Sequence, residues 1–381
     1  MALREVGIPH RLIALLVLGH VAFTGSRFTL TLHAVALHAS PFAIGLLMGL
    51  IMVLPMLLAV RVGRWCDRTG YARPTAIGFT MLAASGLVAG LVPTMPGLYV
   101  ASVLTGSGYM LAHVAMNNAI GQASPASLLT QSFSWLTMGF SLSGIVGPLV
   151  AGFLIDHLGH PAAFLFLPGF TVAGLLLLAM AHSHHSIAPR GAPAASESVR
   201  DLVLNDPLRT VFIVTGVLSM GWDLFMFLAP LHAVRSGLSA TGASLVMGAY
   251  GVGTFAIRLA LPRLTRDASL WRTLSAAMFM TAICYVLFPL AATLPLLLLA
   301  AFAMGLALGC GQPMAMSLLY VTVPASRAGE AVGVRSTITS ASQTVLPLVF
   351  GGLGSALGVA AVFWIGALVM AWGGTFANRR R

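Results

Sequence analysis

Charged side chains are what this sequence has least of. Of its 381 residues only 8% are Asp, Glu, Lys or Arg, whereas 58% are hydrophobic. Soluble domains carry about 25% charged residues, so this chain has too little charge to cover a water-facing surface. A large soluble core is therefore excluded, and we predict an integral membrane protein with many spans.

Lysine is absent and cysteine is scarce. Every basic residue is an arginine, and the net charge is +11. The arginines lie between apolar runs instead of gathering with aromatic residues, which argues against a nucleic-acid partner. The three cysteines show neither a disulfide framework nor a metal-ligand spacing. His182, His184 and His185 lack a cysteine or carboxylate at ligand spacing, so we interpret them as part of a solvated loop.

Motifs of catalysis are also missing. The sequence has no Walker loop, no Ser-His-Asp or zinc spacing, and no glycine-rich dinucleotide loop after a strand. We therefore expect no enzyme, no metal and no cofactor.

Long apolar runs dominate the sequence instead. A helix needs about 20 apolar residues to cross a bilayer, and the chain has six such runs, a polar break and six more. We predict spans at 11–37, 41–62, 74–93, 96–119, 132–155, 161–181, 208–234, 239–262, 271–292, 294–320, 332–354 and 357–376. The predicted fold is an all-α membrane protein with twelve transmembrane helices in two six-helix bundles, 1–181 and 208–381, joined by a linker at 182–207.

The arginines orient these spans. With the N-terminus inside, 17 of the 20 arginines fall on the inner side, Arg235 falls outside, and Arg27 and Arg258 lie within spans. Because basic residues concentrate on the cytoplasmic side, we expect both termini in the cytoplasm and the protein in the inner (plasma) membrane.

An internal repeat relates the two halves. The segment Ser40–Gly49 matches Ser239–Gly248 at an offset of 199 residues, and Arg64 and Arg73 meet Arg263 and Arg272 at the same offset. This pattern indicates a duplicated six-helix unit.

A charged, glycine-containing stretch follows the second span. It carries Gly63, Asp67, Arg68, Gly70 and Arg73. Together with two six-helix halves and a cytoplasmic centre loop, it resembles the major facilitator superfamily, whose loop motif is roughly G-x-x-x-D-R-x-G-R-R. Arg73 stands one place late. We interpret the stretch as a conformational latch, with glycines for a tight turn and close helix approach and Asp67 for an arginine partner near a helix N-terminus. The alternative is that these charges only anchor the loop inside.

The fifth span is rich in small residues. Its glycines and proline are Gly139, Gly144, Gly147, Pro148 and Gly152. We predict that they form one small-residue face for close helix packing. The stretch resembles the span-5 motif of the family's proton-coupled antiporters, G-x-x-x-G-P-x-x-G-G, although Ala151 replaces one glycine. The alternative is close packing of an ordinary helix pair.

Three charged residues lie inside predicted spans: Arg27, Asp223 and Arg258. Intramembrane charge is costly and is a functional hypothesis by default. We predict that Asp223 belongs to a proton or substrate site, with Arg27 as a plausible partner, because the repeat offset places Thr24 and Arg27 near the position equivalent to Asp223. A fixed structural ion pair is the alternative.

Further site residues follow from the resemblance, which implies a central cavity lined by spans 1, 4, 7 and 10 and open to each side in turn. Polar or aromatic residues on these spans are His20, His113, Asn117, Trp222 and Gln312. At the inner end of span 11 we expect a charged gate of Arg327, Glu330 and Arg335.

The sequence therefore predicts a monomeric secondary transporter that exports a small organic molecule in exchange for protons. Its partners would be the substrate, membrane lipid and protons, with the proton gradient as energy source. Proton-coupled uptake of an organic anion stays open, because Arg27 and Arg258 outweigh Asp223 in charge. A membrane scaffold or sensor that kept the fold without transport also stays open.

Overall fold

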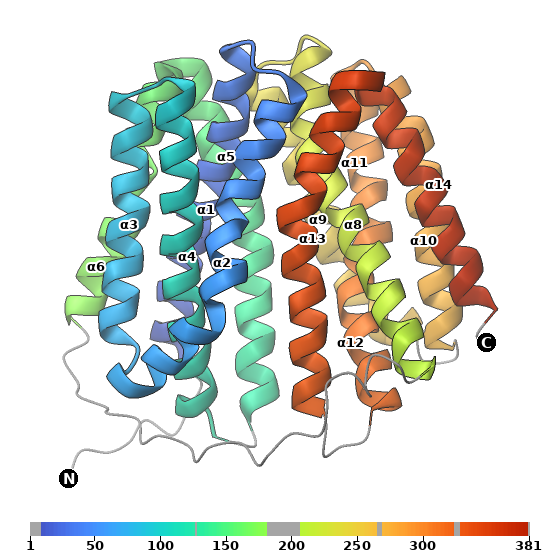
Figure 1. The fold of residues 1–381 in the computed structure, drawn as a ribbon, viewed down its shortest axis with the longest axis horizontal. Helices are drawn as coiled ribbons and strands as arrows, with labels where there is room; N and C mark the ends of the chain where they lie inside the picture. Colours follow the sequence, from blue (N-terminus) through green and yellow to red (C-terminus); the bar gives the residue numbers. More distant parts are fainter. Residues whose placement is uncertain (1–8, 126–127, 181–205, 265–268, 324–327, 380–381) are drawn as a thin grey trace. The chain divides into compact units, whose positions relative to one another are not determined.

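The computed structural model describes residues 9–125, 128–180, 206–264, 269–323 and 328–379, and every regular element among them is a helix (Figure 1). The first half contains α1 (His10–Ala36), α2 (Pro41–Thr69), α3 (Ala72–Leu91), α4 (Met95–Ala123), α5 (Leu129–Phe166) and α6 (Pro168–Met180). The second half contains α8 (Asp206–Arg235), α9 (Ala240–Leu264), α10 (Leu270–Leu287), η2 (Phe288–Leu290), α11 (Leu294–Gly309), α12 (Gly311–Thr322), α13 (Ala328–Leu357) and α14 (Val359–Asn378). The predicted linker lies almost wholly outside the described residues.

Helices form throughout because a chain this apolar must satisfy its backbone hydrogen bonds internally when it crosses a bilayer. Ten segments of the described chain are long and apolar enough to span a membrane. One of them, Gln131–Met180, holds two passes that are separated by the non-helical Gly159. With α13, the described residues form twelve passes, which confirms the predicted fold.

One predicted boundary was wrong in an informative way. The stretch that we interpreted as a loop after span 2 is helical through Thr69, so Gly63 and Asp67 lie inside α2. The predicted tenth span, 294–320, agrees with the membrane-length segment Leu294–Thr322, within which two helices, α11 and α12, meet at Cys310. Cys310 stands between Gly309 and Gly311, and these glycines weaken the helix at that point.

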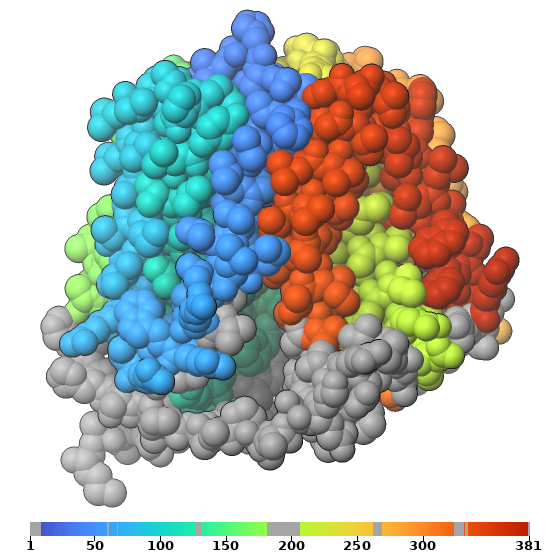
Figure 2. All heavy atoms as spheres, in the orientation of Figure 1, coloured from blue at the N-terminus to red at the C-terminus, as the bar shows by residue number. Residues whose placement is uncertain are grey.

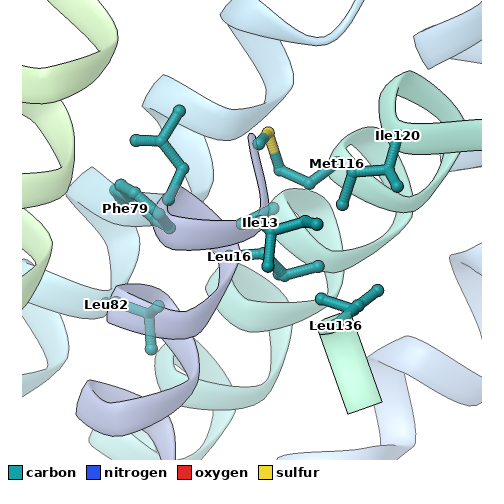
Figure 3. Close-up of a cluster of buried hydrophobic side chains, with 9 residues drawn as sticks. Ile13, Leu16, Phe79, Leu82, Met116, Ile120 and Leu136 are labelled. Atoms are coloured by element: carbon teal, nitrogen blue, oxygen red, sulfur yellow. The ribbon is translucent and has the colours of Figure 1, made fainter. Parts of the chain in front are cut away.

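The described chain falls into two compact units. One comprises Met1–Leu37 with Leu50–Gly191, and the other comprises His38–Gly49 with Ala192–Arg381. The first unit has an apolar core built from α1, α3, α4 and α5. Figure 3 shows side chains of this core, which contains Ile13, Leu15, Leu16, Phe79, Leu82, Ala112, Met116, Ile120 and Leu136.

The first turns of α2 belong to the second unit, where they pack against α13. A Cβ at Gly45 would clash with the carbonyl oxygen of Pro347, and a Cβ at Gly49 would lie 3.1 Å from that of Thr344. The backbone N–H of Phe42 donates to the Ser355 hydroxyl at 3.1 Å. Figure 2 shows the start of α2, in blue, against α13, in red.

Close backbone approaches recur in both units at the predicted offset of 199 residues. A Cβ at Gly106 would clash with the carbonyl oxygen of Ile51, and a Cβ at Gly305 would clash with that of Tyr250. Both members of the first pair lie 199 residues before those of the second. The same helix crossing is therefore built twice, each time on a glycine.

A histidine is also used twice in the same way. The Nε2 atom of His33, near the end of α1, lies 3.2 Å from the carbonyl oxygen of Pro93. The Nε2 atom of His232, near the end of α8, lies 3.0 Å from that of Ala291. Both imidazoles tie the end of the first helix of a unit to the loop before its fourth pass.

Candidate proton and substrate site

Asp223 lies in the middle of α8 and is 1% exposed. Its carboxylate oxygen Oδ2 accepts a hydrogen bond from the Ser342 hydroxyl on α13 at 2.8 Å. An isolated carboxylate is costly to bury, and a donated hydrogen bond offsets part of that cost. The buried carboxylate of α8 therefore has a hydroxyl donor on α13.

A second link joins the same two helices one turn away from Asp223. The hydroxyls of Ser219 on α8 and Thr339 on α13 lie 3.4 Å apart. Residues three or four apart share a helix face, so Ser219 and Asp223 on one helix meet Thr339 and Ser342 on the other. The α8–α13 seam is thus polar along two turns.

Tyrosines of two other helices approach the carboxylate. Tyr250 on α9 and Tyr285 on α10 both lie within electrostatic reach of Asp223. The Tyr250 hydroxyl is hydrogen-bonded to the side chains of Trp222 and Thr254. The Tyr285 hydroxyl donates to the backbone carbonyl of Gly221. The predicted residue Trp222 thus belongs to the same cluster as Asp223.

Arg258 joins this cluster at its edge. The guanidinium is half-buried on α9, about two turns from Tyr250, and it acts electrostatically on the Tyr250 hydroxyl. Its Nε atom donates to the backbone carbonyl of Gly309 at 3.5 Å. A carboxylate and a guanidinium therefore reach the same tyrosine from two helices.

The predicted inner gate is described only in part. Arg335 donates a hydrogen bond to the side-chain oxygen of Gln312, so a predicted gate residue and a predicted site residue are bonded to each other. Arg327 and the side chain of Glu330 lie outside the described residues. The gate stays a prediction.

The first unit has a hydroxyl where the second has its carboxylate. Thr24 on α1 lies 199 residues before Asp223, and Ser143 on α5 lies 199 residues before Ser342. The Thr24 hydroxyl lies 3.0 Å from the backbone oxygen of Ser143. The Ser143 hydroxyl lies 2.6 Å from the Nδ1 atom of His20. The equivalent seam is therefore joined by neutral hydrogen bonds.

Aromatic rings surround this seam in the first unit. The imidazole of His20 lies 4.6 Å from the Phe140 ring and 5.5 Å from the Tyr109 ring, centroid to centroid. Tyr109 stacks on Phe23 at 4.2 Å, and its centroid lies 5.2 Å from that of His113. Predicted residues His20 and His113 thus belong to one ring cluster formed by α1, α4 and α5.

Asn117 follows His113 by one turn on the same face of α4, as its spacing predicts. Its side-chain nitrogen donates to the backbone carbonyl of His113 at 2.7 Å. One donor of this amide is therefore used within its own helix.

The predicted small-residue face of span 5 is only partly correct. A Cβ at Gly139 would clash with Val17, and one at Gly147 would clash with the Thr24 hydroxyl. A Cβ at Gly144 would meet nothing within 4 Å, so Gly144 lies off this face. Spacings of four and eight place Gly139, Ser143 and Gly147 on the face toward α1. Pro148 lies inside α5, and Gly152 is buried.

The predicted latch stays a prediction, but the structure describes the local geometry of its two glycines. Gly70 has a φ of +74°, which glycine adopts without strain, and it makes the turn between α2 and α3. A Cβ at Gly63 would meet nothing within 4 Å, so close helix approach at Gly63 is wrong. Arg68 and Arg73 are exposed, and the side chain of Asp67 lies outside the described residues.

Arg27 lies on α1 in the first unit, and Asp223 lies in the second. Their pairing would join the units and stays a prediction. Within the described chain, no group of three or more His, Cys, Asp or Glu side chains is arranged to hold a metal ion.

Sequence reasoning missed Ser342, Ser143 and Tyr250. Serine and tyrosine carry no formal charge, so they did not stand out in an apolar span. The repeat could have found the two serines, because an offset of 199 that relates Thr24 to Asp223 also relates Ser143 to Ser342.

Comparison with known proteins agrees with this architecture. The family model described as Major Facilitator Superfamily matches residues 12–293 and again residues 211–377. The chain belongs to the Major Facilitator Superfamily. It is therefore a multi-pass membrane transporter of this superfamily, a class of proteins that are not enzymes.

Two curated relatives come from Bacillus subtilis (strain 168). The "Uncharacterized MFS-type transporter YuxJ" is 26% identical over 344 residues, which cover 85% of this chain and 84% of that protein. The "Multidrug resistance protein 1" is 24% identical over 143 residues, which cover 38% of this chain and 35% of that protein.

Solved structures share the superfamily fold. The nucleoside transporter NupG, solved as a point mutant, superposes with a TM-score of 0.84 at 14% identity, over 98% of this chain and 99% of that chain. A bacterial homologue of the human lysosomal transporter Spinster gives a TM-score of 0.75 at 14% identity, over 97% and 94% of the two chains.

Proposed function

We propose that this transporter exports a small organic molecule in exchange for protons, by alternating access. The observation that carries the proposal is the buried Asp223 carboxylate with Ser342 as its hydrogen-bond donor. A carboxylate held between burial and a donated hydrogen bond can bind a proton on one side of the membrane and release it on the other. The proton gradient is then the energy source.

The proposal of export, as opposed to uptake, is inferred from the close packing of α1 against α5. Gly139 and Gly147 let α1 lie close against α5, as the antiporter motif of the superfamily requires. The similarity of part of the chain to a protein named for multidrug resistance supports export of an organic molecule. The ring cluster around His20 offers flat apolar faces to such a substrate.

The arginine distribution supports a place in the inner (plasma) membrane with both termini in the cytoplasm. Uptake of an organic anion together with protons is the second candidate. It is favoured by Arg258, a half-buried guanidinium close to the Asp223 cluster.

Proteoliposomes with a trapped pH dye test the proposal. Panels of lipophilic cations and of organic anions are added with and without an imposed pH gradient. We expect a compound that moves outward to drive protons inward, and Asp223→Asn to abolish this exchange. The matched control is Asp206→Asn, which removes an exposed carboxylate at the start of the same helix. Joint entry of an anion and protons would replace export by uptake, and full flux in Asp223→Asn would overturn the proton site.

A further inference from the structure

Helix α13 touches two different helices with two different faces. Thr339 and Ser342 face α8, where Ser342 binds Asp223. Thr344 and Leu348 face the first turns of α2. There a Cβ at Gly49 would lie 3.1 Å from the backbone carbonyl oxygen of Thr344 and 3.4 Å from the Leu348 Cγ atom. Residues two apart on a helix point to nearly opposite sides. Thus α13 lies between the carboxylate and α2.

The contact with α2 extends along about two turns of α13. The backbone at Pro347 and at Gly351 approaches Gly45 and Pro41 of α2 so closely that neither glycine can carry a Cβ without displacing backbone atoms. With Thr344 and Leu348 these positions follow the spacing i, i+3, i+4 and i+7, which is one face of a helix. Such a backbone contact is sensitive to small shifts of α13.

Pro347 gives α13 a natural place to bend. A proline inside a helix removes one backbone hydrogen bond and loosens the preceding turn. That turn follows Ser342 directly and contains Thr344. A change at the Ser342 hydroxyl can therefore alter the α2 contact without unfolding the helix.

We propose that Ser342 is the positioning residue of the proton site, and that it couples the charge of Asp223 to the contact between α13 and α2. The ionised carboxylate holds the Ser342 hydroxyl and keeps α13 against α2. A proton on the carboxylate weakens this bond and lets α13 leave α2. The inference rests on the proposed function, because it needs Asp223 to take up protons.

Such coupling would serve an exchanger directly. An empty, ionised carrier must not reorient, because that step would waste the gradient. The Ser342–Asp223 bond would hold the empty carrier in one state until a proton or a substrate displaces it. The first unit has no equivalent carboxylate at this position, since Thr24 is neutral.

Other groups near Asp223 must be separated from this effect. Tyr250 and Tyr285 lie within electrostatic reach of the carboxylate, and Arg258 acts on Tyr250. All three reach the site from α9 and α10, whereas Ser342 is on α13. A substitution at Ser342 therefore leaves the groups on these other helices in place.

The test is a disulfide between α2 and α13 in the full-length protein in membranes. Gly49→Cys and Leu348→Cys are introduced after Cys66, Cys284 and Cys310 are replaced by alanine. A Cβ at residue 49 would lie 3.4 Å from the Leu348 Cγ atom, so the two introduced thiols are neighbours when α13 lies against α2. The fraction oxidised by copper phenanthroline is measured from pH 5 to pH 9, without substrate.

We expect cross-linking to fall at acidic pH with Asp223 present, and Asp223→Asn to retain only the pH dependence of the thiol chemistry itself. In Ser342→Ala, the Asp223-dependent change in the oxidised fraction between alkaline and acidic pH should be smaller by about fivefold or more, because a hydrogen bond to a charged group is removed. Ser342→Thr, which keeps a hydroxyl, should restore it. Ser336→Ala, an exposed serine on the same helix, is the matched control.

The outcomes separate the two proposals. If Asp223→Asn flattens the profile but Ser342→Ala matches the parent, the role of Ser342 is overturned and Asp223 stays the proton site. If Ser342→Ala lowers cross-linking equally at every pH, Ser342 is only structural. If the parent shows no Asp223-dependent profile, the coupling to α2 is wrong, and the liposome assay alone decides the proposed function. If Ser342→Ala does not fold, Ser342→Val, which is close in shape to threonine but has no hydroxyl, is compared with Ser342→Thr in the same assay.

Discussion

The two halves of this transporter use the same two positions differently. In the first unit Thr24 of α1 meets the backbone of Ser143 on α5, and in the second Asp223 of α8 meets the hydroxyl of Ser342 on α13. The serine is the same and the helix crossing is equivalent, but a neutral hydroxyl stands where the other half has a carboxylate. The duplicated scaffold has thus kept its geometry while only the second copy carries a carboxylate at this position.

The neighbouring positions differ in the same direction. His20 packs against Phe140 in the first unit, and the equivalent residues in the second are Ser219 and Thr339, whose hydroxyls lie 3.4 Å apart. At these two positions the first seam carries rings and the second carries hydroxyls. Under the proposed function, we expect an organic substrate near the rings and a proton near the hydroxyls.

Making the halves alike should have the largest effect. In Asp223→Thr the second unit carries the residue type of the first, so no carboxylate is left to bind a proton. We expect proton-coupled flux in dye-loaded proteoliposomes to fall by about 100-fold, a typical loss when a proton-transfer group is removed. Asp206→Asn should keep the parental flux. Flux above half of the parental value in Asp223→Thr would mean that the two halves do not differ in proton binding.

The small residue at the first seam is the next point of difference. Gly147 packs against Thr24, whereas its equivalent in the second unit is Leu346. Gly147→Leu should push α1 away from α5 and destabilise the protein by about 3 kcal/mol, the upper end for overpacking. Gly144→Leu is the control, since a Cβ there meets nothing within 4 Å.

Thermal unfolding of the detergent-purified variants, followed by tryptophan fluorescence, measures this difference. The midpoint should drop clearly for Gly147→Leu and little for Gly144→Leu. Equal midpoints for both variants would show that the close approach of α1 and α5 is not needed for stability.

Much of this architecture was predictable because a bilayer imposes simple rules. The lengths of the apolar runs predicted the transmembrane helices, and the 199-residue offset predicted the duplicated six-helix unit. Asp223 stood out because a carboxylate in an apolar span is costly. Each of these signals lies in a local stretch of sequence or in its repetition.

The rest depends on contacts that local patterns do not contain. The bond from Ser342 to Asp223 joins residues 119 positions apart, and a serine in a span carries no signal of its own. The stretch around Asp67 reads as a loop because it is charged, yet α2 continues to Thr69. Charged side chains are compatible with a helix that has left the apolar layer, so composition alone could not locate its end.

The smallest expected effect concerns a position where the halves agree. Gly159 and Gly358, 199 residues apart, have φ values of +83° and +85°, with extended ψ values that almost only glycine adopts. A Cβ at Gly358 would meet no atom within 4 Å, and one at Gly159 would meet only Pro161 at 3.9 Å. Gly159→Ala and Gly358→Ala should therefore each lower the free energy of unfolding by about 1–2 kcal/mol through backbone strain alone. Gly352→Ala lies inside α13, where a Cβ also meets no atom within 4 Å, and should instead raise the free energy of unfolding by about 0.5–1 kcal/mol. Thermal unfolding midpoints of the three variants measure these changes, and unequal losses for the two turn glycines would show that the repeat has diverged even where its backbone is the same.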